Sequence, residues 1–401
     1  MELIEIKKEE FNEIANSFTC KNFFQTANMA STLERRGKKV YYLGLKDKET
    51  YVAITTLYVS GMFLGKKIFT SLKGFLTDYN DPALVKEMSE KLIGFVKNHN
   101  GFKLIVDPYI SLQERDIDGN IVDGGVNNFE IINTLINMGF KKSKIDTQVR
   151  FNFCLDYNGK STDEIMKNFK PTTRNLINRA VREGVEIFDL AYDELSSFKK
   201  ITEYTSLKRG FPDKSLEYYQ MMYEEFKNQV VFKMARLNVE KYKTTLEDTK
   251  KDYEEKLSKT NNAKRMENYK QEIDNISKKL NKVKNIKSNN GYVDLAVGMF
   301  MLYGDETIYL FSGSLDEYIE FGGQYLIQWD IIKYGIEHNY KRHNFFGIID
   351  FQNKDSKEYG IYLFKRGFNG YVLELVGEYH YDIKCIQSLL YNLKSSIRGG
   401  K

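Results

Sequence analysis

The chain has 401 residues, of which 42% are hydrophobic and 29% are charged, with a formal net charge of +5. This length exceeds one ordinary hydrophobic core, so two domains are expected. No apolar run approaches the ~18 residues that indicate a membrane-spanning helix. The N-terminal MELIEIKKEE lacks the apolar centre of a signal peptide. We therefore expect a cytoplasmic protein without a transmembrane segment.

The residue types that bind metals or attack substrates form no familiar pattern. The three cysteines, Cys20, Cys154 and Cys385, are too far apart to predict a disulfide framework or a zinc site. The four histidines show no metal-ligand spacing. The chain also lacks a GxSxG nucleophile elbow, a phosphate-binding P-loop and an HExxH zinc motif. The sequence thus predicts no metal site and argues against a Ser-His-Asp hydrolase and ATP-driven chemistry.

Residues 1–149 alternate short predicted helices and strands, which indicates an α/β lobe. Helices are expected at 11–18, 27–36 and 82–98, and strands at 39–45, 51–59, 66–70 and 102–106. The last strand is apolar and ends at Asp107 and Pro108, because proline cannot donate to a strand ladder. Asp107 is therefore expected at the end of a buried strand.

Residues 150–237 and 291–401 repeat this alternation and predict a second α/β lobe. Strands are expected at 150–155, 185–190, 230–237, 291–303, 306–312, 343–347 and 371–378, and helices at 163–169, 172–183, 192–210, 216–227 and 324–338. Gly304 and Asp305 form a tight turn between two of these strands, which predicts an antiparallel pair.

Residues 238–290 have a different character and interrupt the second lobe. Apolar residues from Met266 to Val283 alternate steps of three and four, which is the spacing of a coiled-coil seam. Residues 239–257 supply a matching seam, so an antiparallel two-helix arm is expected. The segment carries 14 Lys and Arg against 9 Asp and Glu. This surplus of positive charge suits binding to the phosphate backbone of tRNA. The coiled-coil pattern fits a spacer or a dimer contact as well.

Four stretches together resemble the Fem family of aminoacyltransferases, which build peptidoglycan bridges from aminoacyl-tRNA. They are FTSLKGFLTDYND (69–81), KLIVDPYI (103–110), TRNLINRAVREGVEI (173–187), and FGGQYLIQWDIIKYGIEHNYKRHNFFGI (321–348) with EYGIYLFKRGFNG (358–370). The resemblance implies an α/β fold of two lobes like GCN5-related N-acetyltransferases with an inserted coiled-coil arm. It implies aminoacyl-tRNA as co-substrate and no further cofactor.

The same resemblance implies the acceptor and the partners. The acceptor would be a stem-peptide amino group of a peptidoglycan precursor, either lipid II or UDP-MurNAc-pentapeptide. A lipid-linked acceptor would bring the protein to the inner face of the membrane. The sequence also leaves open a homodimer or a complex with another member of the same family.

The resemblance assigns roles at both ends of the chain. Lys365, in a basic FKRGF turn, matches the lysine beside the acyl ester and would stabilise the oxyanion. Phe364 would pack against the terminal adenosine or the substrate. Asp107 would accept the amine's proton or orient the ammonium group, unless it only caps a turn.

Further candidates would bind the acceptor. Lys214 matches a phosphate-contacting arginine, and Tyr218 lies four residues on, on the same helix face. Arg35 and Arg36 end a helix of the first lobe, and Gly74 would let backbone approach the ligand. Alternatively, the charged candidates are ordinary surface residues and Gly74 belongs to an ordinary turn.

Two other function classes compete with this interpretation. An acyl-CoA-dependent N-acyltransferase would need an R/Q-x-x-G-x-G/A loop, whose amides hold a pyrophosphate at a helix N-terminus, and the chain has no such string. A non-catalytic tRNA-binding or scaffold protein would keep the lobes without the chemistry.

Overall fold

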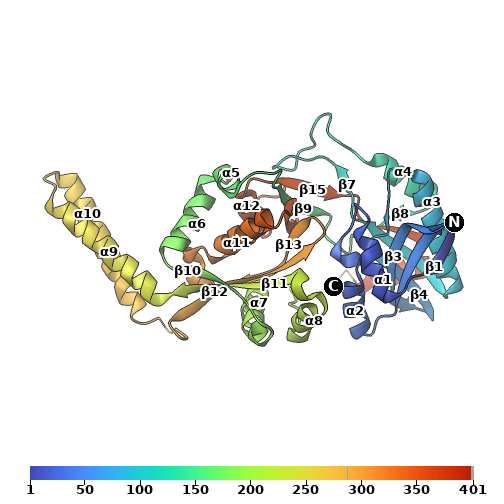
Figure 1. Cartoon of the computed structure of the whole chain (residues 1–401), viewed down its shortest axis with the longest axis horizontal. Coiled ribbons are helices and arrows are strands. Elements are labelled where there is room, and N and C mark those ends of the chain that lie inside the picture. The colour runs from blue at the N-terminus through green and yellow to red at the C-terminus, as the bar shows by residue number, and fades with distance from the viewer. Residues whose placement is uncertain (287, 399–401) are drawn as a thin grey trace.

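The computed structural model describes residues 1–286 and 288–398 and contains two α/β lobes and a helical arm (Figure 1). Each lobe is built on one eight-stranded sheet. The lobes also share packed side chains, because Phe23 and Met29 of the N-terminal half lie in one buried cluster with Phe226 and Phe232. The two sheets therefore form parts of one continuous body.

The first sheet has the strand order β1-β2-β3-β4-β6-β16-β8, with β5 paired to β3. Its strands are β1 (Glu2–Glu5), β2 (Val40–Asp47), β3 (Thr50–Phe63), β4 (Lys66–Lys73), β5 (Leu76–Thr77), β6 (Gly101–Pro108), β8 (Lys141–Lys142) and β16 (Tyr379–Asp382). Its helices are α1 (Lys8–Asn16), α2 (Ala27–Arg35), α3 (Pro82–Asn98), α4 (Phe129–Asn137) and α13 (Cys385–Arg398). Helix α3 begins where Asp81 accepts from the backbone amides of Ala83 and Leu84.

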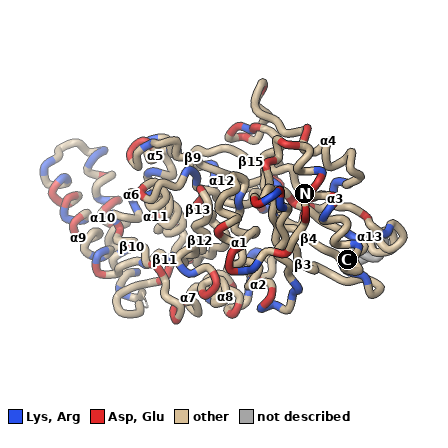
Figure 2. Tube along the Cα trace, turned by 45° about the vertical axis from the view of Figure 1, so that its right-hand side comes forward, with Lys and Arg blue, Asp and Glu red and all other residues tan. Residues whose placement is uncertain are grey.

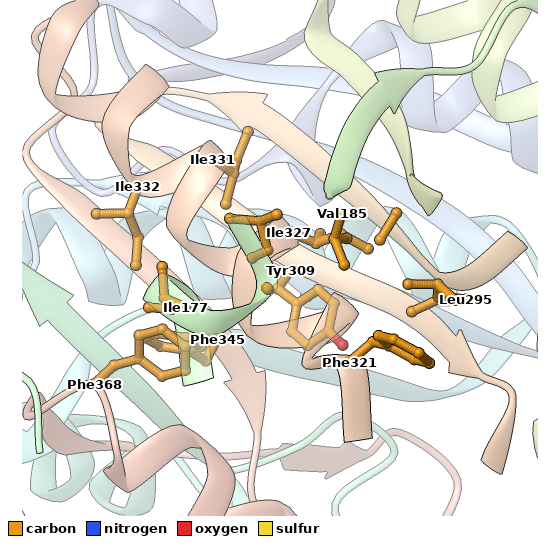
Figure 3. Close-up of a cluster of buried hydrophobic side chains, with 14 of the residues drawn as sticks. Ile177, Val185, Leu295, Tyr309, Phe321, Ile327, Ile331, Ile332, Phe345 and Phe368 are labelled. Carbon is orange, nitrogen blue, oxygen red and sulfur yellow. The ribbon is translucent and has the colours of Figure 1, made fainter. Parts of the chain in front are cut away.

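The second sheet has the order β10-β11-β12-β13-β14-β9-β15-β7. Its strands are β7 (Ser111–Gln113), β9 (Phe151–Asp156), β10 (Val185–Asp189), β11 (Val230–Asn238), β12 (Tyr292–Tyr303), β13 (Glu306–Ser314), β14 (Arg342–Gly347) and β15 (Tyr371–Leu375). Its helices are α5 (Thr162–Asn168), α6 (Pro171–Arg182), α7 (Leu195–Arg209), α8 (Leu216–Phe226), α11 (Gly323–Glu337) and α12 (Tyr359–Arg366). Figure 3 shows Ile327, Ile331 and Ile332 of α11 in the apolar core of this lobe.

The two lobes exchange a strand with each other. Strand β16 lies between β6 and β8 of the first sheet and is antiparallel to both, although it follows the whole second lobe in sequence. In the other direction, β7 lies in sequence between β6 and β8 of the first sheet but pairs with β15 at the edge of the second sheet. Each sheet thus contains a strand whose neighbours in sequence belong to the other sheet.

This exchange corrects the predicted domain boundaries. The sequence analysis assigned 291–401 wholly to the second lobe, but β16 belongs to the first sheet. It assigned 1–149 to the first lobe, but β7 pairs with β15 in the second sheet. Strand β16 has four residues and β7 has three. Segments this short carry no periodicity of their own, so only their long-range partners reveal them.

The segment 238–290 forms an arm that projects from the second lobe (Figure 1). Its helices are α9 (Val239–Ser258) and α10 (Ala263–Val283), and Asn238 and Asn262 cap their N-termini. The rings of Tyr253 and Tyr269 meet with centroids 5.8 Å apart. Both helices are therefore observed within the predicted arm, and Figure 2 shows mixed basic and acidic residues along them.

We predict that the exchanged strand is essential to the first lobe. A chain that ends at Gly377 lacks β16 and α13, and loses the buried side chain of Tyr379, a loss of about 3–5 kcal/mol. The single tryptophan, Trp329, lies in α11 and reports on the second lobe. In urea, circular dichroism should then show a transition at low urea concentration, when the first lobe unfolds. Tryptophan fluorescence should not change in that transition.

A chain that ends at Asp382 keeps β16 without α13 and serves as the matched control. It should unfold close to the full-length protein. Coincident transitions of both signals in the chain ending at Gly377, at the full-length midpoint, would contradict the importance of β16.

Candidate active site

The central parallel strand pair differs between the two lobes. In the first lobe, β4 and β6 stay paired over residues 67–73 and 101–108. In the second lobe, β13 and β14 pair only over 306–308 and 342–344, although β13 continues to Ser314. The second sheet therefore opens between these strands at their carboxyl ends, where open α/β sheets commonly bind ligands.

The Lys365 side chain lies against the end of β14 that is not paired with β13. Its Nζ donates to the carbonyl oxygens of Gly347 (2.6 Å) and Phe346 (3.3 Å). Phe346 has a positive φ of 61°, so the backbone turns away from the ladder here. Lys365 is only 5% exposed, and burial lowers its pKa to about 7. A buried amine that titrates near neutrality is a common feature of catalytic sites.

The predicted basic turn is wrong at Lys365. Phe364 and Lys365 lie on the last turn of α12, which ends at Arg366. Phe364 packs against Tyr325, with ring centroids 4.8 Å apart, and against Phe368, at 5.6 Å. Consecutive residues of a helix point in different directions, so Phe364 and Lys365 have different surroundings. Lys365 contacts backbone carbonyls, and Phe364 belongs to an aromatic cluster.

His343 of β14 supports this region from within the core. It is fully buried, its Nε2 donates to Gln328 (2.9 Å), and the Thr307 hydroxyl donates to its Nδ1 (2.7 Å). Burial, together with the charge of Lys365, lowers the pKa of His343 to about 3. A neutral, fully hydrogen-bonded imidazole fits a structural role.

Asp107 forms a buried ion pair in the first lobe. Its carboxylate lies 2.7 Å from Nζ of Lys73, and the two side chains are 2% and 3% exposed. They meet because β4 and β6 are parallel neighbours, with Leu72 aligned opposite Asp107. Burial raises the pKa of Asp107, and the Lys73 ammonium opposes that rise. The carboxylate is thus held by a partner inside the sheet.

Gly74 is needed for packing inside the protein. A Cβ at this position would collide with the Gln25 side chain and the Ser71 hydroxyl. Gln25 is fully buried, donates to Leu72 O (2.6 Å) and accepts from Thr56 N (2.8 Å). The glycine therefore allows the Lys73 backbone to lie against Gln25, and a ligand contact for Gly74 remains a prediction.

Tyr109 links the strand of Asp107 to the open sheet of the second lobe. Its hydroxyl donates to Glu306 (2.8 Å) and accepts from Asn344 (3.0 Å). Arg342 donates to the same Glu306 carboxylate (3.2 Å). Glu306 and Asn344 lie in the short paired section of β13 and β14. The two candidate centres belong to different lobes, and this network joins them.

Three predicted substrate-binding residues meet at the junction of the lobes. The Arg36 guanidinium lies 5.7 Å from the ring centroid of Tyr218, and Nζ of Lys214 lies 5.6 Å from the same ring. Phe311 of β13 packs edge-on against Tyr218. The backbone amide of Lys214 donates to Asp213 (2.8 Å), which anchors the loop before α8. We call Arg36, Lys214, Tyr218 and Phe311 the junction cluster.

Arg35 is placed differently from its neighbour. Its guanidinium contacts the carboxylates of Glu224 (2.6 Å) and Glu225 (3.1 Å) of α8. Within the described part of the chain, Arg36 and Lys214 have no ion pair. Arg36 and Lys214 thus retain exposed cations for an anionic ligand, whereas Arg35 helps join the lobes, which differs from its predicted role.

Sequence reasoning missed Lys73, Tyr109 and Phe311. A signal for Lys73 was present, because it directly precedes Gly74 at the end of a strand parallel to the strand of Asp107. Carboxyl ends of neighbouring parallel strands meet at one sheet edge. Tyr109 and Phe311 had no local signal, since their partners lie about two hundred and about one hundred residues away in sequence.

Within residues 1–286 and 288–398, no group of three or more His, Cys, Asp or Glu side chains is arranged to hold a metal ion. The helices of the described part include none that is both long and apolar enough to span a bilayer.

The FemAB family model matches residues 6–397. The chain belongs to the FemAB family. It is 29% identical to aminoacyltransferase FemB of Staphylococcus epidermidis, with 99% of each chain covered. This confirms the family resemblance seen in the four sequence stretches.

Two solved structures support the fold of this FemAB protein. The crystal structure of FemX superposes with a TM-score of 0.77 at 19% identity, covering 98% of this chain and 99% of FemX. A tandem GNAT protein from the clavulanic acid biosynthesis pathway gives 0.50 at 8% identity, covering 95% and 98%. The predicted pair of GCN5-related N-acetyltransferase-like lobes is confirmed.

We predict that Lys73→Met destabilises the FemAB protein by about 3–5 kcal/mol, because it leaves the Asp107 carboxylate buried without its partner. The double variant Lys73→Met/Asp107→Leu removes both charges and should recover much of the loss. Urea unfolding measures both. Lys67→Met, on the same strand but outside the pair, should stay within about 0.5 kcal/mol of the native protein. Equal losses in single and double variants would argue against the pair.

The lowered pKa of Lys365 predicts a pH-dependent stability. Between pH 7 and 10.5 the unfolded chain holds a proton on Lys365 that the folded protein has released. The unfolding free energy therefore rises with pH across this window. The variant Lys365→Met lacks this contribution, so the native protein should gain stability relative to it from pH 7 to 10. Lys357→Met, at an exposed position, should show a constant difference, and a constant difference for Lys365→Met would refute the buried amine.

Proposed function

We propose that this FemAB protein transfers an amino acid from aminoacyl-tRNA to the stem-peptide amino group of a peptidoglycan precursor, and so builds the interpeptide bridge. The observation that carries the proposal is the opening between β13 and β14, with the buried amine of Lys365 beside it. The full-length similarity to aminoacyltransferase FemB supports the reaction class.

The reaction is aminolysis of an ester. The acceptor nitrogen attacks the ester carbonyl carbon, a C–N bond forms, the C–O bond to the tRNA ribose breaks, and the amine loses a proton to solvent or to the leaving ribose oxygen. The ester is already activated, so the step requires neither ATP nor a metal. The protein needs to align both substrates and stabilise the oxyanion.

In this proposal Lys365 stabilises the oxyanion. Its Nζ is held by two carbonyl oxygens at the end of β14 that is not paired with β13, which fixes its position. Negative charge that develops nearby favours the protonated amine and raises its pKa above the value set by burial. Phe364, through its cluster with Tyr325, would support the terminal adenosine of tRNA.

Arg36 and Lys214 of the junction cluster would bind the diphosphate of the acceptor. Their cations flank the Tyr218 ring and come from different lobes, so an anion between them would bridge the lobes. Asp107 would orient the acceptor ammonium group. Its carboxylate is already engaged by Lys73, which favours a binding role over that of a base.

The helical arm would contact the tRNA. Helices α9 and α10 project from the lobe that holds Lys365, and the lysines of the arm suit a phosphate backbone. The reaction would take place in the cytoplasm, where charged tRNA is available.

The test is transfer of radiolabel from a pool of charged tRNAs to purified lipid II and to UDP-MurNAc-pentapeptide. The native protein should transfer one amino acid. Lys365→Met should lower kcat about 10²–10³-fold. Arg36→Ala and Lys214→Ala should each raise KM for the precursor about ten-fold with little change in kcat. Lys38→Ala, an exposed lysine two residues from Arg36, is the matched control.

The outcomes separate the three function classes. Failure of every charged tRNA with both acceptors would contradict the proposal. Thermal stabilisation by CoA but not by precursor would then favour an acyl-CoA enzyme, and tRNA binding without transfer would favour a scaffold.

A further inference from the structure

Strand β14 contains a bulge at the carbonyl oxygens that hold Lys365. On the β9 side, Asn344 is aligned with Cys154. The next aligned pair is Gly347 with Asn152. Three steps along β14 therefore match two steps along β9, so β14 carries one extra residue in this section. Bulges bend a strand and are common next to active sites, where they change the direction of nearby groups.

The bulge contains a backbone conformation that a bulky residue does not favour. Phe346 has a φ of 61°, a region in which its side chain is strained. Beyond this turn β14 is no longer paired with β13, and the carbonyl oxygens of Phe346 and Gly347 both accept from Nζ of Lys365. A strained residue persists only where its surroundings hold it in place.

The Asn344 side chain holds this turn. It is 2% exposed, and its Oδ1 accepts from the backbone amide of Phe346 (2.8 Å). Its Nδ2 donates to the Tyr109 hydroxyl (3.0 Å) and to the Glu306 carboxylate (3.3 Å). A reversed amide would place two donors against each other at Phe346 and two acceptors against each other at Glu306. The hydrogen bonds therefore fix one orientation of Asn344.

Tyr109 brings the first lobe into contact with Asn344. It lies just beyond the end of β6, and its hydroxyl donates to Glu306 (2.8 Å) while it accepts from Asn344. Burial and the charge of Glu306 raise the pKa of Tyr109 well above its usual value, so the phenol keeps its proton. A continuous path of hydrogen bonds and backbone thus runs from the first lobe, through Asn344 and the bulge, to Lys365.

We propose that Asn344 is a positioning residue for Lys365, and that Tyr109 lets the first lobe stabilise this position. The consequence for catalysis rests on the proposed transfer reaction, in which Lys365 stabilises the oxyanion. Such stabilisation depends on a charge that is already aimed at the place where the oxyanion develops. The effect of Asn344 on Lys365 itself does not depend on any substrate.

The first measurement is the pKa of Lys365 in the full-length protein without substrates. With isotope-labelled lysine, the NMR signal of the carbon next to Nζ follows protonation, and Lys365→Met identifies that signal. Asn344→Val removes the three hydrogen bonds of Asn344 and should shift this pKa. The shift is downward if the amine stays buried without its carbonyl acceptors, and upward toward 10.5 if it turns to solvent. An unchanged pKa would overturn the proposal.

The groups that act on Lys365 by charge are left intact in this variant. They are Cys154 of β9 and Glu358, which directly precedes α12, and Lys365 in turn acts on His343 of β14. A change in the pKa of Lys365 therefore reports on its carbonyl acceptors and its burial.

Asn344→Thr is the matched partner of Asn344→Val. The two side chains have the same shape, but the threonine hydroxyl can accept from the amide two residues on, as the Asn344 oxygen does. Asn344→Thr should therefore shift the pKa of Lys365 less than Asn344→Val. Equal shifts would show that the hydrogen bond to Phe346 is unimportant and would contradict the proposal.

Tyr109→Phe tests the contribution of the first lobe, because it removes only the hydroxyl. It should shift the pKa of Lys365 in the same direction as Asn344→Val, by a smaller amount. Tyr303→Phe is the control, since the Tyr303 hydroxyl also joins the two halves of the chain, through Asn16 (3.5 Å), outside this network. It should leave the pKa unchanged. If Asn344→Val does not fold, Asn344→Thr and Tyr109→Phe decide the outcome, and native pKa values in both would overturn the proposal.

The second measurement is the kinetics of transfer. Asn344→Val should lower kcat about ten-fold and Tyr109→Phe about three-fold, with KM for the precursor unchanged, because a positioning defect acts on the transition state. A raised KM with native kcat would contradict a positioning role. If the native protein transfers no amino acid, the proposed function fails, whereas the pKa measurement still decides the role of Asn344.

Discussion

The placement of β7 in the second sheet and of β16 in the first sheet ties the two lobes to each other. Strand β16 occupies an interior place in the first sheet, although it follows the second lobe in sequence, and β7 forms an edge of the second sheet between two strands of the first. The lobes therefore cannot separate without breaking ladder hydrogen bonds in both sheets. A fixed junction is what allows Arg36 of α2 and Tyr218 of α8 to form one cluster, and Tyr109 to reach Glu306.

The two lobes share an architecture but differ at the carboxyl ends of their central parallel strands. The first lobe closes its central parallel pair and places the Lys73–Asp107 ion pair at its end, where both charges are satisfied. The second lobe leaves the corresponding pair open and places Lys365 there, paired only with carbonyl oxygens. A satisfied pair stabilises a position, whereas an amine near neutrality can respond to a developing negative charge. This asymmetry supports our proposal that the acyl donor binds at the second lobe.

Cations without carboxylate partners mark the surfaces proposed for ligands. Arg36 and Lys214 differ from Arg35 in this respect. Both lie beside an aromatic ring at the lobe junction, which suits a phosphate-bearing ligand. The net charge of +5 did not predict this location.

Local sequence patterns predict most helices and strands, the two-helix arm, the family and the candidates Asp107, Lys365 and Lys214, because periodicity, a strand-ending proline and short motifs depend on neighbouring residues. The fold was needed to show that β16 completes the first sheet, that Lys73 neutralises Asp107, that Lys365 is a buried helical residue, and that Arg36 rather than Arg35 lies beside Tyr218. Strand partners, burial and charge pairing depend on residues far apart in the chain, so no local pattern contains them.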